Sequence, residues 1–183
     1  YLKACEEMGS KADILQFILY TYCREGEADT LTWSDWNQDS LIHIHKTWSK
    51  DENGKYFVDK KPKTPDSDRY IHLPAQVRNL LNSRYAEVEG TDAGKPDAWI
   101  FPAMKDKTKP LSESSTYNLH KQALKRARLN MRLRVHDLRH SVISFNIRNS
   151  EIDCLSALSK QAGHSSRAIT ESIYEHVLDS QHK

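Results

Sequence analysis

The segment Val135-His136-Asp137-Leu138-Arg139-His140-Ser141 places an arginine between two histidines. Residues three and four apart on a helix share a face, so His136, Arg139 and His140 are expected to converge if the segment is helical. The residue pattern predicts such a helix over residues 136–149. Because imidazoles transfer protons and guanidinium groups bind anions, the segment predicts a functional site on this helix.

Other side chains that bind phosphate or transfer protons lie elsewhere along the chain. Together with the first segment they form an ordered set: Arg24, Lys63, His136, Arg139, His164 and Tyr174. Singly, each has an ordinary explanation, because a lone arginine is usually a surface charge and a tyrosine late in a helix usually packs inside. The information therefore lies in the order of the whole set.

The chain resembles the catalytic domain of the tyrosine recombinases, the phage-integrase type of site-specific DNA recombinase. The family pattern is Arg, Lys, His-x-x-Arg, His or Trp, and Tyr, and its later part is matched by His136-Asp137-Leu138-Arg139, Gly163-His164-Ser165-Ser166 and Tyr174-Glu175-His176-Val177. The segment Thr21-Tyr22-Cys23-Arg24 departs from the usual Thr-Gly-x-Arg, although Glu27 three residues later agrees with the family. The resemblance spans essentially the whole chain.

The resemblance implies a phosphodiester as the substrate and a tyrosine as the nucleophile. Arg24 and Arg139 would bind the non-bridging phosphate oxygens, because a guanidinium presents its donors in a fixed fork. Tyr174 would attack the phosphorus and form a 3′-phosphotyrosyl link. This link conserves the energy of the broken bond, so religation is expected to need no ATP. Arginine, lysine and histidine side chains would supply the positive charge that Mg²⁺ gives other nucleases, so no metal or other cofactor is expected.

The same resemblance assigns the remaining roles. His136 would accept the tyrosine proton, Lys63 would protonate the departing 5′ oxygen, and His164 would hydrogen-bond the phosphate. Lys60 and Lys61 lie in the same loop as Lys63 and stay open as alternatives for the catalytic lysine.

The expected fold is α+β: a mostly helical tyrosine-recombinase (DNA breaking-rejoining) catalytic domain with a small three-stranded antiparallel sheet near its N-terminal side. Strands are predicted at residues 41–45, 56–58 and 70–73, with Asn53-Gly54 as a hairpin turn between the first two. Helices are predicted at residues 13–22, 75–85, 112–129, 136–149, 152–162 and 167–177. Residues 1–183 are expected to form one catalytic domain, without the N-terminal core-binding domain of full-length relatives.

The net charge of the chain is only +2, but positive charge gathers in one region. The basic residues expected to contact DNA phosphates are Lys121, Lys125, Arg126, Arg128, Arg132 and Arg134. On charge alone, a solvated helix face explains them equally well. Hydrophobic residues make up 38% of the chain and charged residues 28%, which indicates a folded globular protein rather than a membrane-spanning or disordered one.

The resemblance implies double-stranded DNA at specific attachment sites as the partner. The full-length protein is expected to assemble as a tetramer on DNA, whereas residues 1–183 alone are expected to be monomeric. The expected role is integration or excision of a phage or another mobile element. The expected location is cytoplasmic and nucleoid-associated, for a protein that is bacterial or phage-encoded.

Three alternatives remain on the sequence. The His136-x-x-x-His140 spacing also occurs in zinc sites, but Asp137 stands where a glutamate is usual and Arg139 would repel the metal. A catalytically inactive DNA-binding relative is the second alternative. The third is a type IB topoisomerase, which shares the phosphotyrosyl chemistry.

Overall fold

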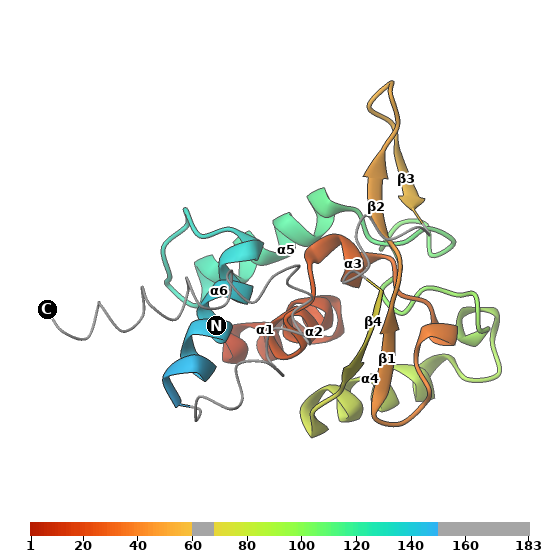
Figure 1. The fold of residues 1–183 in the computed structure, drawn as a ribbon, viewed down its shortest axis with the longest axis horizontal. Coiled ribbons are helices and arrows are strands. Elements are labelled where there is room, and N and C mark those ends of the chain that lie inside the picture. Colours follow the sequence, from red (N-terminus) through yellow and green to blue (C-terminus); the bar gives the residue numbers. More distant parts are fainter. Residues whose placement is uncertain (60–67, 150–183) are drawn as a thin grey trace, which may run out of the picture.

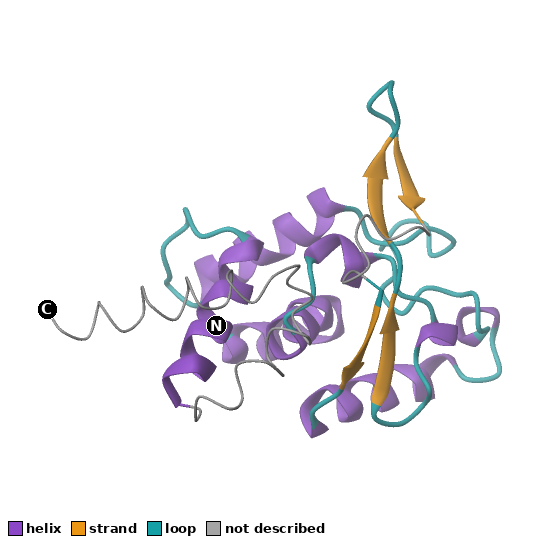
Figure 2. Cartoon of the chain, in the orientation of Figure 1, coloured by secondary structure: helices purple, strands orange, loops and turns teal. Residues whose placement is uncertain are grey.

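The structure is a computed structural model that describes residues 1–59 and 68–149. Most of the helices lie together on one side of the molecule, the strands and one further helix lie beside them, and one hairpin stands away from the body (Figure 1; Figure 2). The helices are α1 (Leu2–Met8), α2 (Asp13–Thr21), α3 (Glu25–Asp29), α4 (Ala75–Val88), α5 (Glu113–Arg126) and α6 (Val135–Asn149), with the 3-10 helices η1 (Gly9–Ala12), η2 (Trp33–Asp35) and η4 (Asp92–Gly94). The strands are β1 (Leu41–Ile44), β2 (Thr47–Lys50), β3 (Tyr56–Asp59) and β4 (Arg69–His72).

Helix α2 lies at the centre of the hydrophobic core. Its side chains Ile14, Leu15, Phe17 and Ile18 are all buried, and the helix contacts α1, α3, α4, α5 and α6. Burying one such side chain contributes about 1.5–3 kcal/mol to folding. The predicted helix over residues 13–22 is confirmed, and its central position fixes where the chain emerges at Tyr22.

The predicted three-stranded sheet is wrong. The structure has two two-stranded antiparallel sheets, in which β1 pairs with β4 and β2 pairs with β3. The chain leaves β1 at His45 and Lys46, whose side chains bind Asp35 at 2.8 and 2.7 Å. Strand β2 was missed because its hairpin stands off the core and lacks the apolar alternation of a half-buried strand.

The turn at Asn53-Gly54 is confirmed, but it joins β2 to β3. Gly54 has a φ of 76°, in the left-handed region that glycine adopts without strain. Its backbone N–H donates to the carbonyl oxygen of Asp51 at 2.9 Å. The Asp51 carboxylate accepts from the backbone N–H groups of Asn53 and Lys55 at 2.9 and 2.8 Å, which tightens the turn.

The predicted helices after β4 are confirmed within the described residues, with shifted ends. Helix α5 ends at Arg126, before the predicted residue 129, because Arg128 adopts a left-handed φ of 55°. The N–H groups of Arg128 and Leu129 then donate to the carbonyl oxygens of Lys125 and Leu124, which is a Schellman motif. The predicted helices at residues 152–162 and 167–177 lie outside the described residues. None of the described helices combines the length and apolar character that crossing a membrane requires.

Candidate active site

A pocket of about 250 Å³ lies where the N-terminal ends of α5 and α6 meet the start of α3. Its lining residues are Ile18, Cys23, Arg24, Glu25, Gly26, Thr47, Glu113, Val135, His136 and Arg139. The structure thus brings Arg24 together with His136 and Arg139, which lie far from it in sequence. Lys63, His164 and Tyr174 lie outside the described residues.

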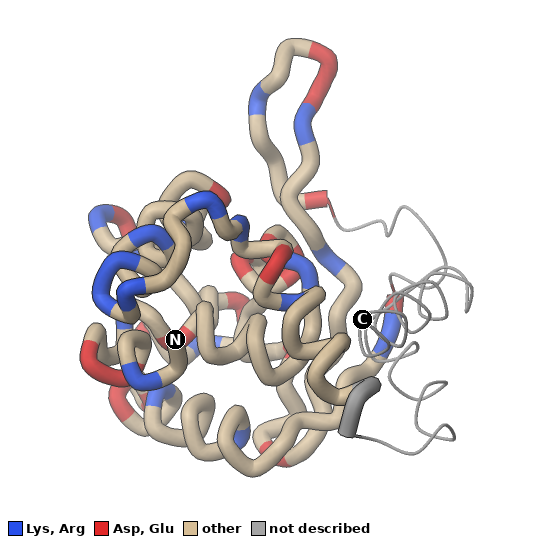
Figure 3. The backbone as a smooth tube through the Cα atoms, turned by 90° about the vertical axis from the view of Figure 1, so that its left-hand side faces the viewer, with Lys and Arg blue, Asp and Glu red and all other residues tan. Residues whose placement is uncertain are grey.

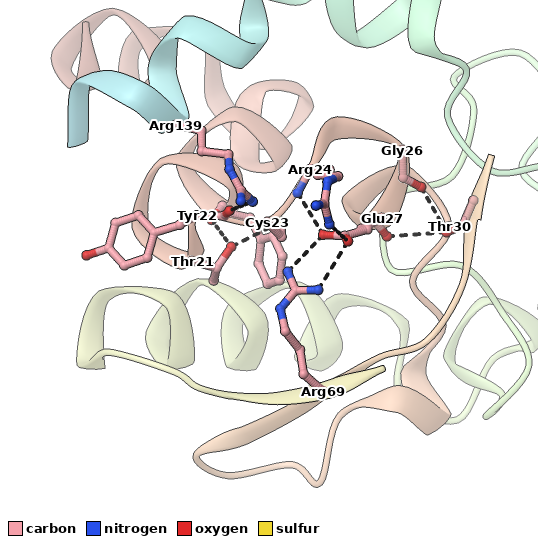
Figure 4. Close-up of polar contacts among 10 residues, drawn as sticks. Thr21, Tyr22, Cys23, Arg24, Gly26, Glu27, Thr30, Arg69 and Arg139 are labelled. Carbon is pink, nitrogen blue, oxygen red and sulfur yellow. Dashed lines mark hydrogen bonds and ion pairs between the residues drawn. The ribbon is translucent and has the colours of Figure 1, made fainter. Parts of the chain in front are cut away.

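Arg24 is held by the carboxylate of Glu27. The Arg24 backbone N–H donates to Glu27 Oε2 at 2.8 Å, and Arg24 Nη1 donates to Glu27 Oε1 at 2.9 Å (Figure 4). These contacts form a capping box at the start of α3, with Arg24 as the N-cap residue. They fix the backbone of Arg24 while 43% of its side chain stays exposed.

The Glu27 carboxylate is also bound by Arg69 at the start of β4. Arg69 Nη1 and Nη2 donate to Glu27 Oε1 and Oε2 at 3.1 and 2.9 Å (Figure 4). Burial alone would raise the pKa of Glu27, but the hydrogen bonds and charge of Arg69, with those of Arg24, outweigh burial and lower it. Glu27 is therefore ionised at neutral pH.

Arg139 projects from α6 into the buried side of the pocket. It is 2% exposed, and its guanidinium donates to the backbone carbonyl oxygen of Tyr22. Burial, followed by the nearby charge of Arg24, lowers the pKa of Arg139 to about 10. Arg139 is still protonated at neutral pH, so the pocket holds two mutually repelling guanidinium groups suited to an anion.

His136 lies at the start of α6 on the exposed side of the pocket. Burial lowers its pKa, and the neighbouring His140, Arg139, Arg134 and Arg24 lower it further. The imidazole is therefore neutral at pH 7 and able to accept a proton. Asp137 caps the helix, accepting from the backbone N–H of Arg134 at 2.8 Å.

The two histidines of the opening segment share a face of α6, as predicted. Their ring centroids lie 4.5 Å apart. Within residues 1–59 and 68–149, however, no group of three or more His, Cys, Asp or Glu side chains is placed to hold a metal ion. The described residues thus offer no third ligand for a zinc site.

The family model described as Phage integrase family matches residues 2–181. The chain belongs to the phage integrase family. Its members are the tyrosine recombinases, and this family's fold accounts for the mostly helical α+β architecture.

Solved structures of similar fold include three recombinases. The Tn1549 transposon integrase, in complex with transposon right end DNA, has a TM-score of 0.73 and 19% identity over 89% of this chain and 53% of its own. XerA recombinase has a TM-score of 0.71 and 19% identity over 99% of this chain and 59% of its own. A lambda integrase dimer bound to a core site has a TM-score of 0.58 and 15% identity over 94% and 44%.

These similarities show a shared fold. This chain spans about half the length of the structures it matches. No curated protein sequence matches it.

The departure of this integrase-family chain from Thr-Gly-x-Arg has a backbone consequence. Tyr22, where the pattern has glycine, adopts a left-handed conformation with φ 58°. Such a conformation costs a non-glycine residue about 1–2 kcal/mol. Three hydrogen bonds hold Tyr22 in this conformation. Its backbone N–H donates to the carbonyl oxygen of Ile18, and its own carbonyl oxygen accepts from Arg139. Its hydroxyl oxygen accepts from Asn146 Nδ2 at 2.6 Å.

The carboxylates of Glu25 and Glu113 also line the pocket, and sequence reasoning missed both. Burial, and then the charge of Glu113, raises the pKa of Glu25 to about 7. Glu25 Oε1 is buried and has no hydrogen-bond partner among the described residues, whereas Glu113 accepts from the hydroxyl of Tyr56 at 3.1 Å. In sequence, acidic residues in a first helical turn are so common that they carry no functional signal.

The predicted DNA-binding residues divide into two groups. Lys121 Nζ donates to the carbonyl oxygens of Met131 and Leu133, Arg126 pairs with Glu7 at 3.8 Å, and Arg134 pairs with Asp137 at 3.0 Å. Arg126 thereby contacts α1, while Lys121 and Arg134 contact the connection between α5 and α6 and the start of α6.

The second group is Lys125, Arg128 and Arg132. They are exposed, and within the described part of the chain none of their side chains forms a hydrogen bond or ion pair. Figure 3, which views the molecule from the side of the α5–α6 connection, shows Lys and Arg gathered on this side.

Proposed function

We propose that this chain is the catalytic domain of a site-specific DNA recombinase that cleaves and rejoins strands through a 3′-phosphotyrosyl intermediate. The observation that carries the proposal is the convergence of Arg24, Arg139 and a neutral His136 on one pocket. Membership of the phage integrase family supports it.

The pocket has the properties that phosphodiester cleavage requires. Charge on the non-bridging oxygens must be neutralised, and two guanidinium groups supply this with fixed fork geometry. The N-terminal ends of α5 and α6 carry the positive ends of the helix dipoles, which also favour the negative charge of a phosphate. Arg24 and Arg139 are accordingly the phosphate ligands in this proposal.

Tyr174 is the nucleophile in the proposed reaction. Its hydroxyl oxygen bonds to phosphorus, its proton passes to His136, and the bond to the 5′ oxygen breaks as Lys63 protonates that oxygen. Full ionisation of a tyrosine at pH 7 costs about 4 kcal/mol, which the cationic pocket offsets. His164 donates a hydrogen bond to the phosphate. The roles of Lys63, His164 and Tyr174 rest on the sequence motifs.

Double-stranded DNA at an attachment site is the proposed partner, in the integration or excision of a mobile element. Structures of related fold were determined with DNA, among them the Tn1549 integrase with transposon end DNA and XerH recombinase with its difH substrate. The exposed group Lys125, Arg128 and Arg132 supports a phosphate-facing surface. The full-length protein is proposed to act as a tetramer, and residues 1–183 to be monomeric alone.

Covalent trapping on nicked duplexes tests this function. Duplexes covering the DNA that flanks the gene are incubated with the protein, and adducts are resolved on a denaturing gel. The native chain is expected to form adducts and Tyr174→Phe to form none. Tyr117→Phe, which alters an exposed tyrosine of α5, is the matched control and should behave as native. Adducts that persist in Tyr174→Phe would remove Tyr174 from its role.

A further inference from the structure

Arg69 and Glu27 form a buried ion pair directly behind Arg24. Only 8% of the Arg69 side chain and 4% of the Glu27 side chain are exposed. Their bidentate contacts, at 3.1 and 2.9 Å, join residues 42 apart in sequence. Figure 4 shows Glu27 between the two arginines, with Arg69 approaching from the β4 side.

The single carboxylate of Glu27 therefore binds two arginines. It accepts from the backbone N–H and Nη1 of Arg24 and from both terminal nitrogens of Arg69. A carboxylate offers about four lone-pair positions, so these contacts saturate it. The orientation of Arg24 thus depends on a group whose own position Arg69 fixes.

Among Arg24, Glu27 and Arg69 alone, two positive charges meet one negative charge. The single negative charge of Glu27 balances only one of the two arginines. Because Arg69 is the more deeply buried partner, the Arg69–Glu27 pair is close to neutral, and the 43% exposed side chain of Arg24 retains its positive charge toward the pocket. Without Arg69, Glu27 would neutralise Arg24 instead, and the pocket would attract a phosphate less.

We propose that Arg69 is a positioning residue for strand cleavage: it acts as the counter-ion of Glu27 and so leaves the charge of Arg24 for the DNA phosphate. This inference rests on the proposed role of Arg24. Arg69 also begins the strand that directly follows the segment containing Lys63. The same ion pair therefore ties the start of β4 to the residue that holds Arg24.

The salt dependence of DNA binding tests the inference without any cleavage. Binding of a fluorescent duplex is measured against salt concentration for the native chain, Arg24→Ala, Arg69→Met and the double variant. Each phosphate contact contributes about 0.9 to the log–log slope. Arg69→Met should lose about as much slope as Arg24→Ala, and the double variant should lose no more than either.

A matched control separates this role from a general loss of stability. Arg84 forms a comparable pair with Asp13 at 2.8 Å, and its side chain is 18% exposed. Arg84 is absent from the pocket lining. Arg84→Met should lower the unfolding temperature, as Arg69→Met does, and keep the native slope.

Two further variants test the charge argument and stand in if Arg69→Met fails to fold. Arg69→Lys keeps the positive charge and should retain most of the slope. Glu27→Gln combined with Arg69→Met should regain slope, because a neutral amide does not compensate the charge of Arg24. The inference would be overturned if a folded Arg69→Lys lost as much slope as Arg24→Ala, or if the folded Glu27→Gln/Arg69→Met variant lost as much.

Adduct formation on nicked DNA at saturating concentration supplies the kinetic readout. Removing one electrostatic donor to a transition state slows other enzymes by about 10²–10³-fold. Arg69→Met should slow the rate by roughly tenfold or more, with a smaller change in the half-saturating DNA concentration. A folded Arg69→Met with native slope and native rate overturns the inference. If the native chain binds DNA and forms no adduct, the proposed cleavage fails, and the slopes still decide the role of Arg69.

Discussion

The buried guanidinium of Arg139 donates a hydrogen bond to the backbone carbonyl oxygen of Tyr22, the residue that ends α2 and turns the chain toward Arg24. This contact joins α6, which carries His136, to the turn that positions the other pocket arginine. Arg139 therefore has a structural role as well as its proposed chemical one, and the two arginines should respond differently to substitution.

Arg24→Ala and Arg139→Ala should both slow adduct formation by about 10²–10³-fold, because each removes a proposed phosphate ligand. Their stabilities should differ. Arg139→Ala removes a buried charged donor and should cost about 1.5–3 kcal/mol, whereas Arg24→Ala leaves Glu27 paired with Arg69 and should cost less than about 1 kcal/mol. Urea denaturation measures this difference, and equal losses would contradict it.

At position 22, glycine should give a more stable protein than alanine. Both substitutions remove the same side-chain contacts, but only glycine adopts a φ of 58° without strain. Tyr22→Gly should therefore be more stable than Tyr22→Ala by about 0.5–1 kcal/mol. The control pair is Lys125→Gly and Lys125→Ala within α5, where alanine should be the more stable. The same order at both positions would show that Tyr22 is unstrained.

Glu25 should make the protein less stable as the pH rises. Its pKa in the folded protein is about 7, against an ordinary value of 4.5. Between these values the unfolded chain has released the proton and the folded chain still holds it, so stability falls with rising pH. Glu25→Gln should remove this loss, giving a gain of about 1–3 kcal/mol at pH 8 and little change below pH 4.5.

Thermal unfolding from pH 4 to pH 8.5 measures this dependence. Glu52→Gln, an exposed substitution near the β2–β3 turn, is the control and should leave the pH profile unchanged. A Glu25→Gln profile that runs parallel to the native one would show that Glu25 does not titrate in this range.

The exposed basic residues should contribute to the salt dependence of DNA binding. Lys125→Glu and Arg128→Glu should each lower the log–log slope by about 0.9 or more, because each removes a phosphate contact. Lys107→Glu, an exposed lysine outside this group, should have little effect. Unchanged slopes in the first two variants would leave the end of α5 as a solvated surface.

Cleavage should survive chelation. In the proposed reaction Arg24 and Arg139 neutralise the charge that Mg²⁺ neutralises in other nucleases. Adduct formation should therefore be the same with excess EDTA as without it. Activity that disappears with EDTA and returns with a divalent ion would favour a metal-dependent mechanism.

Local patterns were sufficient to predict α2, α4, α5 and α6 and the shared face of His136 and Arg139, whereas α1 was not predicted. Residues three and four apart on a helix share a face whatever surrounds them, so the sequence of α6 by itself placed His136, Arg139 and His140 together. The turn at Asn53-Gly54 was equally predictable from the sequence, since the left-handed φ of its glycine depends on backbone sterics alone. The order of the motifs also predicted membership of the phage integrase family.

Long-range packing decided the rest. The pair between Arg69 and Glu27 spans 42 residues, and no periodicity links them. The split of the sheet after β1 depends on Asp35, which draws His45 and Lys46 away from the strand. Tyr22 adopts its strained conformation because Arg139 and Asn146 of α6 bind it. Such contacts form only when distant segments are packed together, since burial then makes each hydrogen bond and charge strong enough to override local preference.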